Sequence, residues 1–175
     1  MKKCLILICA IMLLCSAACA DSASIDFHNR FELSGDLPSG WRCAILSQND
    51  MTLEGAILPD SGDPALPTMT VFASFNESYA GVADLQHLDP ADLERIRAAF
   101  SLENEVSFDT LQTASGVSLL VIRETGADQD FLDFYTVRQG YEIELTLFVG
   151  ESGTLTDDQV AKCMDCMKTL AITAK

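Results

Sequence analysis

Of the motifs in this chain, the Cys-x-x-Cys spacing of Cys163 and Cys166 is the one most often associated with redox chemistry or metal binding. A Cys-x-x-Cys pair is typical of thiol–disulfide exchange when its first thiol lies at a helix N-terminus, where the helix dipole lowers the pKa. Here an apolar stripe places the pair about two turns inside a helix that begins at Thr156. We therefore interpret Cys163 as a core cysteine and Cys166 as a residue at the edge of the stripe.

Metal binding or hydrolysis has few other candidates. Zinc would need two ligands beyond the cysteine pair, and Cys43, His28 and His87 are the available side chains. The clustered carboxylates lack the spacing of a calcium-binding EF-hand loop; they are Asp128, Asp130, Asp133, Glu142 and Glu144. We predict no catalytic, cofactor-binding or metal-binding residue. The alternative is a small secreted enzyme or metal or redox protein that uses Cys163 and Cys166 or surface carboxylates.

A disulfide is a separate hypothesis for the same thiols. Seven cysteines are present, but four of them lie within the first 20 residues. The remaining three allow one bridge within a monomer, between Cys43 and either Cys163 or Cys166. Closing a loop of that length stabilises a fold by about 4–5 kcal/mol in the chain-entropy model.

Residues 1–20 have the pattern of a signal peptide. Lys2 and Lys3 precede a short apolar run, and small residues follow it at positions 16–20. The run is short for a membrane span. Two processing routes remain open. In the first, cleavage between Ala20 and Asp21 releases a soluble protein. In the second, residues 16–19 are a lipobox and Cys19 receives a diacylglyceryl group. We predict a protein exported by a bacterium, either secreted or lipid-anchored on the outer side of the membrane.

Composition limits the partners of the exported part. Removing residues 1–20, which hold two of the 11 Lys and Arg and none of the 26 Asp and Glu, changes the formal net charge from −15 to −17. No basic stripe remains, so we exclude nucleic acid as a partner. We expect membrane attachment only through a lipid on Cys19, because an acidic surface is not attracted to anionic lipid. We expect a monomer that binds an unidentified protein or small molecule.

The remaining sequence predicts a short leader at 21–30 and a single α+β domain at 31–175. Asp89 followed by Pro90 begins one helix, and a capping box of Thr156 with Gln159 begins the other. Period-two alternation predicts strands at 31–33, 41–46, 51–58, 69–75, 106–111, 117–122, 131–137 and 141–149. Hairpins connect most of them, so we expect an antiparallel sheet with helices packed on it, an α/β/α sandwich. A further alternative is a subunit that assembles through an edge strand at 141–149.

The turn Leu37-Pro38-Ser39-Gly40-Trp41 after a first strand resembles the PsbP-like family. The helix near 90–100, the hairpin at Ser115-Gly116 and the long last strand before a C-terminal helix add to this resemblance, which covers about residues 31–172. That family contains an extrinsic oxygen-evolving protein of photosystems, a Ran-binding nuclear factor and many small exported bacterial proteins of unknown role. The resemblance implies a fold and no functional residue. We expect a non-enzymatic binding or accessory protein at the cell envelope.

Overall fold

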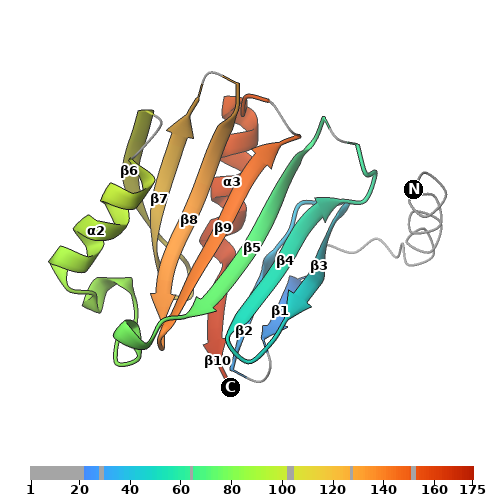
Figure 1. The fold of residues 1–175 in the computed structure, drawn as a ribbon. Helices are drawn as coiled ribbons and strands as arrows, with labels where there is room; N and C mark the ends of the chain where they lie inside the picture. Colours follow the sequence, from blue (N-terminus) through green and yellow to red (C-terminus); the bar gives the residue numbers. More distant parts are fainter. Residues whose placement is uncertain (1–21, 28–29, 64, 102–104, 127, 151–152) are drawn as a thin grey trace.

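Two antiparallel sheets, of seven and three strands, dominate the fold (Figure 1). The computed structural model describes residues 22–27, 30–63, 65–101, 105–126, 128–150 and 153–175. Of these residues, 51% lie in strands and 20% in helices. The strands are β1 (Ser22–Phe27), β2 (Phe31–Asp36), β3 (Trp41–Gln48), β4 (Thr52–Pro59), β5 (Pro67–Phe75), β6 (Glu105–Gln112), β7 (Ser118–Thr125), β8 (Asp130–Arg138), β9 (Tyr141–Val149) and β10 (Ala171–Ala174). The helices are the short η2 (Glu77–Tyr79) and η3 (Leu85–His87), and the longer α2 (Pro90–Phe100) and α3 (Asp157–Thr169).

The seven-stranded sheet consists of two meanders that meet at its centre. Its order is β3-β4-β5-β9-β8-β7-β6, and every neighbouring pair is antiparallel. The chain leaves β5, crosses the sheet through α2 and returns from the far edge as β6 to β9. The β5–β9 pairing then joins the two meanders over nine residue pairs, from Pro67↔Val149 to Phe75↔Tyr141.

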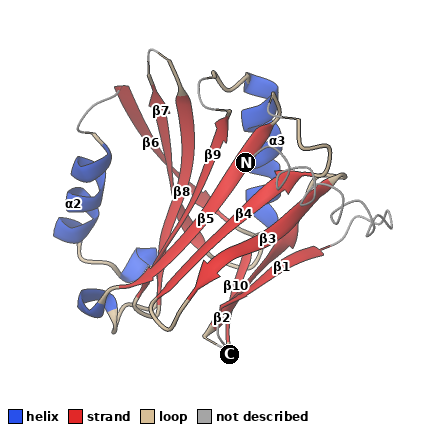
Figure 2. Cartoon of the chain, turned by 45° about the vertical axis from the view of Figure 1, so that its right-hand side comes forward, coloured by secondary structure: helices blue, strands red, loops and turns tan. Residues whose placement is uncertain are grey.

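Side-chain alternation gives this sheet an inner face that holds the main core. Val71, Ile143 and Leu145 are buried there, while their strand neighbours point to the opposite, outer face. Helix α3 covers part of the inner face, and the three-stranded sheet β1-β2-β10 covers another part through Phe27, Phe31 and other apolar residues. Figures 1 and 2 show α3 and the small sheet on the same side of the large sheet, with α2 on the other side.

Among the described residues, an apolar cluster covers the outer face over β6, β7 and β8. Ile96 of α2 packs there with Ile122 and Tyr135 in a second apolar cluster, to which η2 and η3 also contribute. Beyond this cluster the outer face contacts solvent, and Phe72 on β5 is 41% exposed. Each face of the seven-stranded sheet is therefore covered by one of the longer helices over part of its width.

These observations correct the expected fold. The expected α+β class and its α/β/α sandwich are both wrong, because the fold is mainly β and a second sheet shares the inner face with α3. Residues 22–27 of the expected leader form strand β1, since Ile25 and Phe27 bury their side chains in the core. The expected edge strand at 141–149 is also wrong: β9 lies between β5 and β8, so both of its backbone edges are paired.

Other expectations are confirmed. Helix α2 begins after Asp89, whose carboxylate accepts a hydrogen bond from the N–H of Ala91, and Pro90 is its first residue. Helix α3 begins with the expected capping box between Thr156 and Gln159. The four strands after α2 lie close to the expected positions. These signals depend on residues close together in the sequence, so the predictions hold although the predicted arrangement of the elements is wrong.

Candidate functional site

An apolar cavity of about 330 Å³ lies between the first half of α3 and the large sheet. Its walls come from three regions: the turn and start of β3 that hold Leu37 and Trp41, the central strands, and the buried stripe of α3. The remaining apolar lining consists of Pro38, Ile57, Leu66, Pro67, Met69, Leu147, Cys163, Cys166 and Met167. Protein interiors normally contain few voids larger than a water molecule. A space of this size is within the range of small-molecule binding sites.

The polar groups of the cavity lie at the N-cap of α3 and on its first two turns. Thr156 and Gln159 satisfy each other through the capping box: the N–H of Thr156 donates to Gln159 Oε1 and the N–H of Gln159 to Thr156 Oγ1, with nitrogen-to-oxygen distances of 2.8 and 3.3 Å. Lys162 and Asp158 form an exposed ion pair with an Nζ to Oδ2 distance of 2.6 Å. Because these side chains contact solvent, they mark the rim where the cavity opens.

A smaller cavity of about 30 Å³ lies next to the first, between the two sheets and the second half of α3. Leu37, Ile57, Cys166 and Met167 line both spaces and form the partition between them. Cys43 lines only the small cavity, whereas Cys163 lines only the large one. The three thiols are thus distributed around one apolar region.

The thiols are poorly suited to redox catalysis. All three are free. Burial, with a smaller contribution from the Cys166 thiol, raises the pKa of Cys163 to about 12. Burial also raises the pKa of Cys43 and, together with Asp165 and Asp36, that of Cys166. The thiolate is the nucleophile in thiol exchange, and burial of these thiols favours the protonated form instead.

The disulfide between Cys43 and Cys163 or Cys166 stays a prediction. Cys43 and Cys166 line the same small cavity, and Cys163 does not. If one bridge forms on oxidation, this placement favours the pairing of Cys43 with Cys166.

The carboxylates considered for metal binding are spread over different surroundings. Asp128 is exposed, Asp130 is buried and accepts a hydrogen bond from the N–H of Leu155, and Asp133 is buried on the outer face of β8. Glu142 and Glu144 lie half-buried on the outer face of β9. Among the described residues, no group of three or more His, Cys, Asp and Glu side chains could hold a metal ion.

Of the other residues considered from the sequence, the structure describes His87 but not four others. Cys19, Ala20, Asp21 and His28 lie outside the described residues. His87 is exposed, and its Nδ1 lies 2.7 Å from Asp84 Oδ1. The side chains considered for a zinc site are therefore not brought together in the part that the structure describes.

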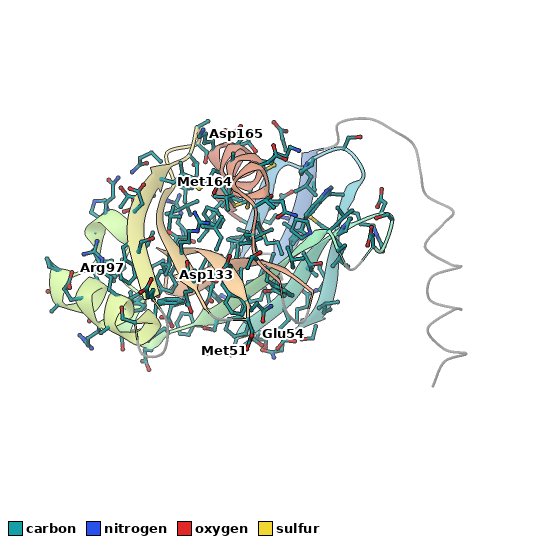
Figure 3. The ribbon with its side chains drawn as sticks, turned by 90° about the horizontal axis from the view of Figure 1, so that it is seen from above. Met51, Glu54, Arg97, Asp133, Met164 and Asp165 are labelled. Atoms are coloured by element: carbon teal, nitrogen blue, oxygen red, sulfur yellow. The ribbon has the colours of Figure 1, made fainter. Side chains whose placement is uncertain are left out.

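Figure 3 shows the separation of the two faces directly. Met164 and Asp165 lie on α3 at one side of the sheet, and Met51 and Glu54 lie at the other. Arg97 lies on α2, away from α3. The cavity and the outer-face carboxylates are therefore separate regions.

Comparison with known proteins gives no relative from which to transfer a role. No family model matches the chain, and no curated protein is significantly similar to it. The PsbP-like relationship therefore stays a prediction. Within the described residues, no helix has both the length and the apolar character needed to cross a membrane.

Sequence reasoning missed the cavity, although two of its signals were visible. Trp41 contributes to the resemblance only as the end of a Pro-Ser-Gly turn, yet its ring lines the space. The apolar stripe of α3 holds Cys163 where a helix packed tightly on a sheet often has a larger residue. One small residue on the buried stripe, Cys163, together with a lone tryptophan, is the signal that could have indicated room for a ligand.

Proposed function

We propose that this chain is an exported, non-enzymatic binding protein that holds a small apolar molecule between α3 and the large sheet. The single observation that supports the proposal is the 330 Å³ cavity, with its apolar walls and its rim of solvent-accessible polar groups. An engineered apolar cavity of about 150 Å³ is sufficient for benzene. This one therefore has room for roughly a dozen carbon atoms.

The chemistry of the lining favours binding over reaction. The polar side chains at the rim are already paired with one another, through the capping box and the Lys162–Asp158 ion pair. Two thiols line the cavity. Burial raises the pKa of Cys163 to about 12 and also raises that of Cys166, which favours the protonated thiols at neutral pH. An apolar ligand needs none of these groups to change its protonation state.

The test uses Trp41, the only tryptophan of the chain, as a reporter inside the cavity. Binding of 1-decanol to the mature protein should shift Trp41 emission to shorter wavelength and saturate. We expect 1-hexanol to bind much more weakly, because each methylene contributes about 0.8 kcal/mol of burial energy. An unchanged spectrum in a protein shown to be folded by circular dichroism would refute the proposal.

A filling variant connects this signal to the cavity. Cys163→Phe adds a ring where the lining has space, and we expect it to weaken decanol binding at least tenfold, about 1.4 kcal/mol. Met164→Phe is the matched control, because residue 164 is the next residue on the same helix and does not line the cavity. We expect its affinity to stay within twofold of the wild type. Equal loss in both variants would assign the effect to a general change in α3.

A further inference from the structure

The two edge strands of the large sheet, β3 and β6, differ in what they expose (Figures 1 and 2). In the part of the chain that the structure describes, β3 pairs only with β4, and β6 only with β7. The exposed side chains of β6 are all polar, and Glu105 and Asp109 among them are acidic. Charged side chains on an edge strand oppose pairing with another chain. On β3, by contrast, Ile45 and Leu46 are 46% and 65% exposed, so β3 is the edge that can accept a further strand.

The hydrogen-bond pattern shows which backbone groups of β3 face away from β4. The N–H of Asp60 donates to the carbonyl of Gly40 at 2.6 Å, so these residues form a hydrogen-bonded pair directly before the ladder of β3 and β4. Hydrogen-bonded and non-hydrogen-bonded pairs alternate along an antiparallel ladder. The N–H and C=O groups of Cys43 and Ile45 therefore point to the free edge. Strand β1 approaches β3 in space, but its backbone pairs with β2.

A β-bulge near the end of β3 makes this edge more apolar. The register shifts between Ile45 and Ser47, so Leu46 has no partner residue on β4. Bulges often protect an edge by twisting it, but here the extra residue is a largely exposed leucine. Met51, in the turn between β3 and β4, is 50% exposed. Ile45, Leu46 and Met51 line neither cavity, so they form a separate apolar surface, of the kind that marks an interaction site.

Charge indicates what kind of partner fits this surface. Residues 43–75, which include most of β3 and all of β4 and β5, contain four acidic residues and no Lys or Arg. Two of them, Asp50 and Glu54, are exposed at the end of the hairpin that holds the apolar side chains. The cation of β3, Arg42, lies at the opposite end, where its Nε is 3.4 Å from Asp60 Oδ1. A basic segment complements these carboxylates, whereas a second copy carries the same net charge of −15.

We propose that the free edge of β3 binds an extended segment of a basic protein, which adds to the large sheet as a further strand. The backbone groups of Cys43 and Ile45 form hydrogen bonds with the segment. Its apolar residues contact Ile45 and Leu46, and its Lys or Arg side chains contact Asp50 and Glu54. Because this edge is separate from the cavity, the inference does not depend on the proposed function.

The first experiment measures binding of a fluorescein-labelled heptapeptide of alternating lysine and valine to the mature protein by fluorescence anisotropy. We expect saturable binding that weakens as the salt concentration rises, because salt screens exposed charges. A heptapeptide with glutamate in place of lysine should bind at least tenfold more weakly. If a folded protein binds neither peptide, or both equally, the proposal is wrong.

Two N-methylated forms of the lysine–valine peptide test whether it binds as a strand. In an extended strand the N–H groups of the valines face one edge and those of the lysines face the other. Methylation of the set that faces β3 removes the donors of the new ladder. We expect one methylated peptide to bind at least tenfold more weakly and the other to stay within threefold of the unmodified peptide. Equal losses would show that the peptide does not pair with the edge.

Substitutions at the two sheet edges locate the binding surface. Leu46→Lys introduces the residue type that natural edge strands use against pairing, and we expect at least tenfold weaker binding of the lysine–valine peptide. Thr110→Lys, at an exposed position on β6, makes the same change in net charge and should stay within twofold of the wild type. Glu54→Gln should weaken binding severalfold and reduce its dependence on salt. Equal loss in Leu46→Lys and Thr110→Lys would refute the assignment to β3.

Sedimentation of the protein without peptide tests a second copy as the occupant. We expect a monomer at micromolar concentration, because two copies of the acidic edge repel each other. A dimer that Leu46→Lys converts to a monomer would assign the edge to self-association and overturn the proposal of a basic partner.

Discussion

The two longer helices cover opposite faces of the same sheet, and their interfaces differ in kind. Under α2 the contacts are made by large side chains: Phe100 and Tyr135 meet edge to face with ring centroids 6.3 Å apart, and the Arg97 guanidinium lies over the ring of Phe108. Under α3 the helix contributes Cys163 and Met167 to the interface, and the cavity remains beside them.

This difference shows that an amphipathic helix on a sheet does not by itself decide whether the space between them is filled. Both helices have good N-terminal caps and an apolar stripe. The size of the stripe residues and the shape of the neighbouring loops decide the packing. At α3, the turn that holds Leu37 and Trp41 forms one wall of the cavity, and the cavity separates this turn from the first half of the helix.

The two sides also differ in polarity. On the outer face, Glu142 accepts hydrogen bonds from Tyr135 Oη at 2.7 Å and from Asn76 Nδ2 at 3.1 Å. Asp133, on the neighbouring strand, is only 2% exposed. Of the described buried residues on the α3 stripe, none carries a charge. The response of stability to pH should therefore originate mainly from the outer face.

The largest expected effect comes from Asp133. Burial, with smaller contributions from Glu144 and Glu124 against the favourable Thr146 hydrogen bond, raises its pKa from 3.8 to about 7. Because the folded state keeps the proton between about pH 4 and 7 and the unfolded state releases it, stability falls as pH rises through this window. Above it, the cost approaches about 4 kcal/mol, at 1.36 kcal/mol per pKa unit.

Asp133→Asn keeps the shape of the side chain and removes the charge. We expect urea unfolding at pH 8 to show a variant about 2–4 kcal/mol more stable than the wild type, and a much smaller gain at pH 5. Asp109→Asn, at an exposed position on β6, is the control and should change stability little at either pH. An equal gain for Asp133→Asn at both pH values would mean that its charge is not what destabilises the outer face.

The sequence could predict features that depend on nearby residues, but not those that depend on distant ones. Helix starts at Asp89 and Thr156 depend on hydrogen bonds to the next few residues, so they are visible locally. The alternation in β9 shows which side chains point inward, but not which strands lie beside it. Its central place depends on pairing with β5, from which about 65 residues separate it. Local periodicity contains no information about that pairing.

Short strands are hidden for a related reason. β1 has Ile25 and Phe27 as its buried side chains, in a stretch that otherwise reads as polar, and its hydrogen bonds go to β2. β10 follows α3 directly and pairs with the other edge of β2. The cavity is harder still, because a void depends on space that no side chain fills. Residue types can indicate small side chains, but only the assembled walls define the space.

The second prediction compares enlargement of one buried residue on each helix. Ile96→Phe should destabilise the protein by about 1–3 kcal/mol, because the ring must displace Ile122 and Tyr135 in a filled cluster. Cys163→Phe should change stability by less than about 1 kcal/mol, because the ring enters the cavity. Thermal unfolding of both variants at pH 6 measures the difference. Similar destabilisation would show that the space under α3 cannot accept a side chain.

The smallest expected effect concerns the two helix caps. Thr156→Ala and Asp89→Ala each remove a cap side chain, so each should cost about 1 kcal/mol in urea unfolding. Thr156 also lies at the rim of the cavity, while Asp89 begins the helix on the opposite face. We therefore expect Thr156→Ala to weaken decanol binding severalfold and Asp89→Ala to leave it unchanged. Loss of binding in both variants would mean that the cavity depends on global stability, and the two faces would then act as one cooperative unit.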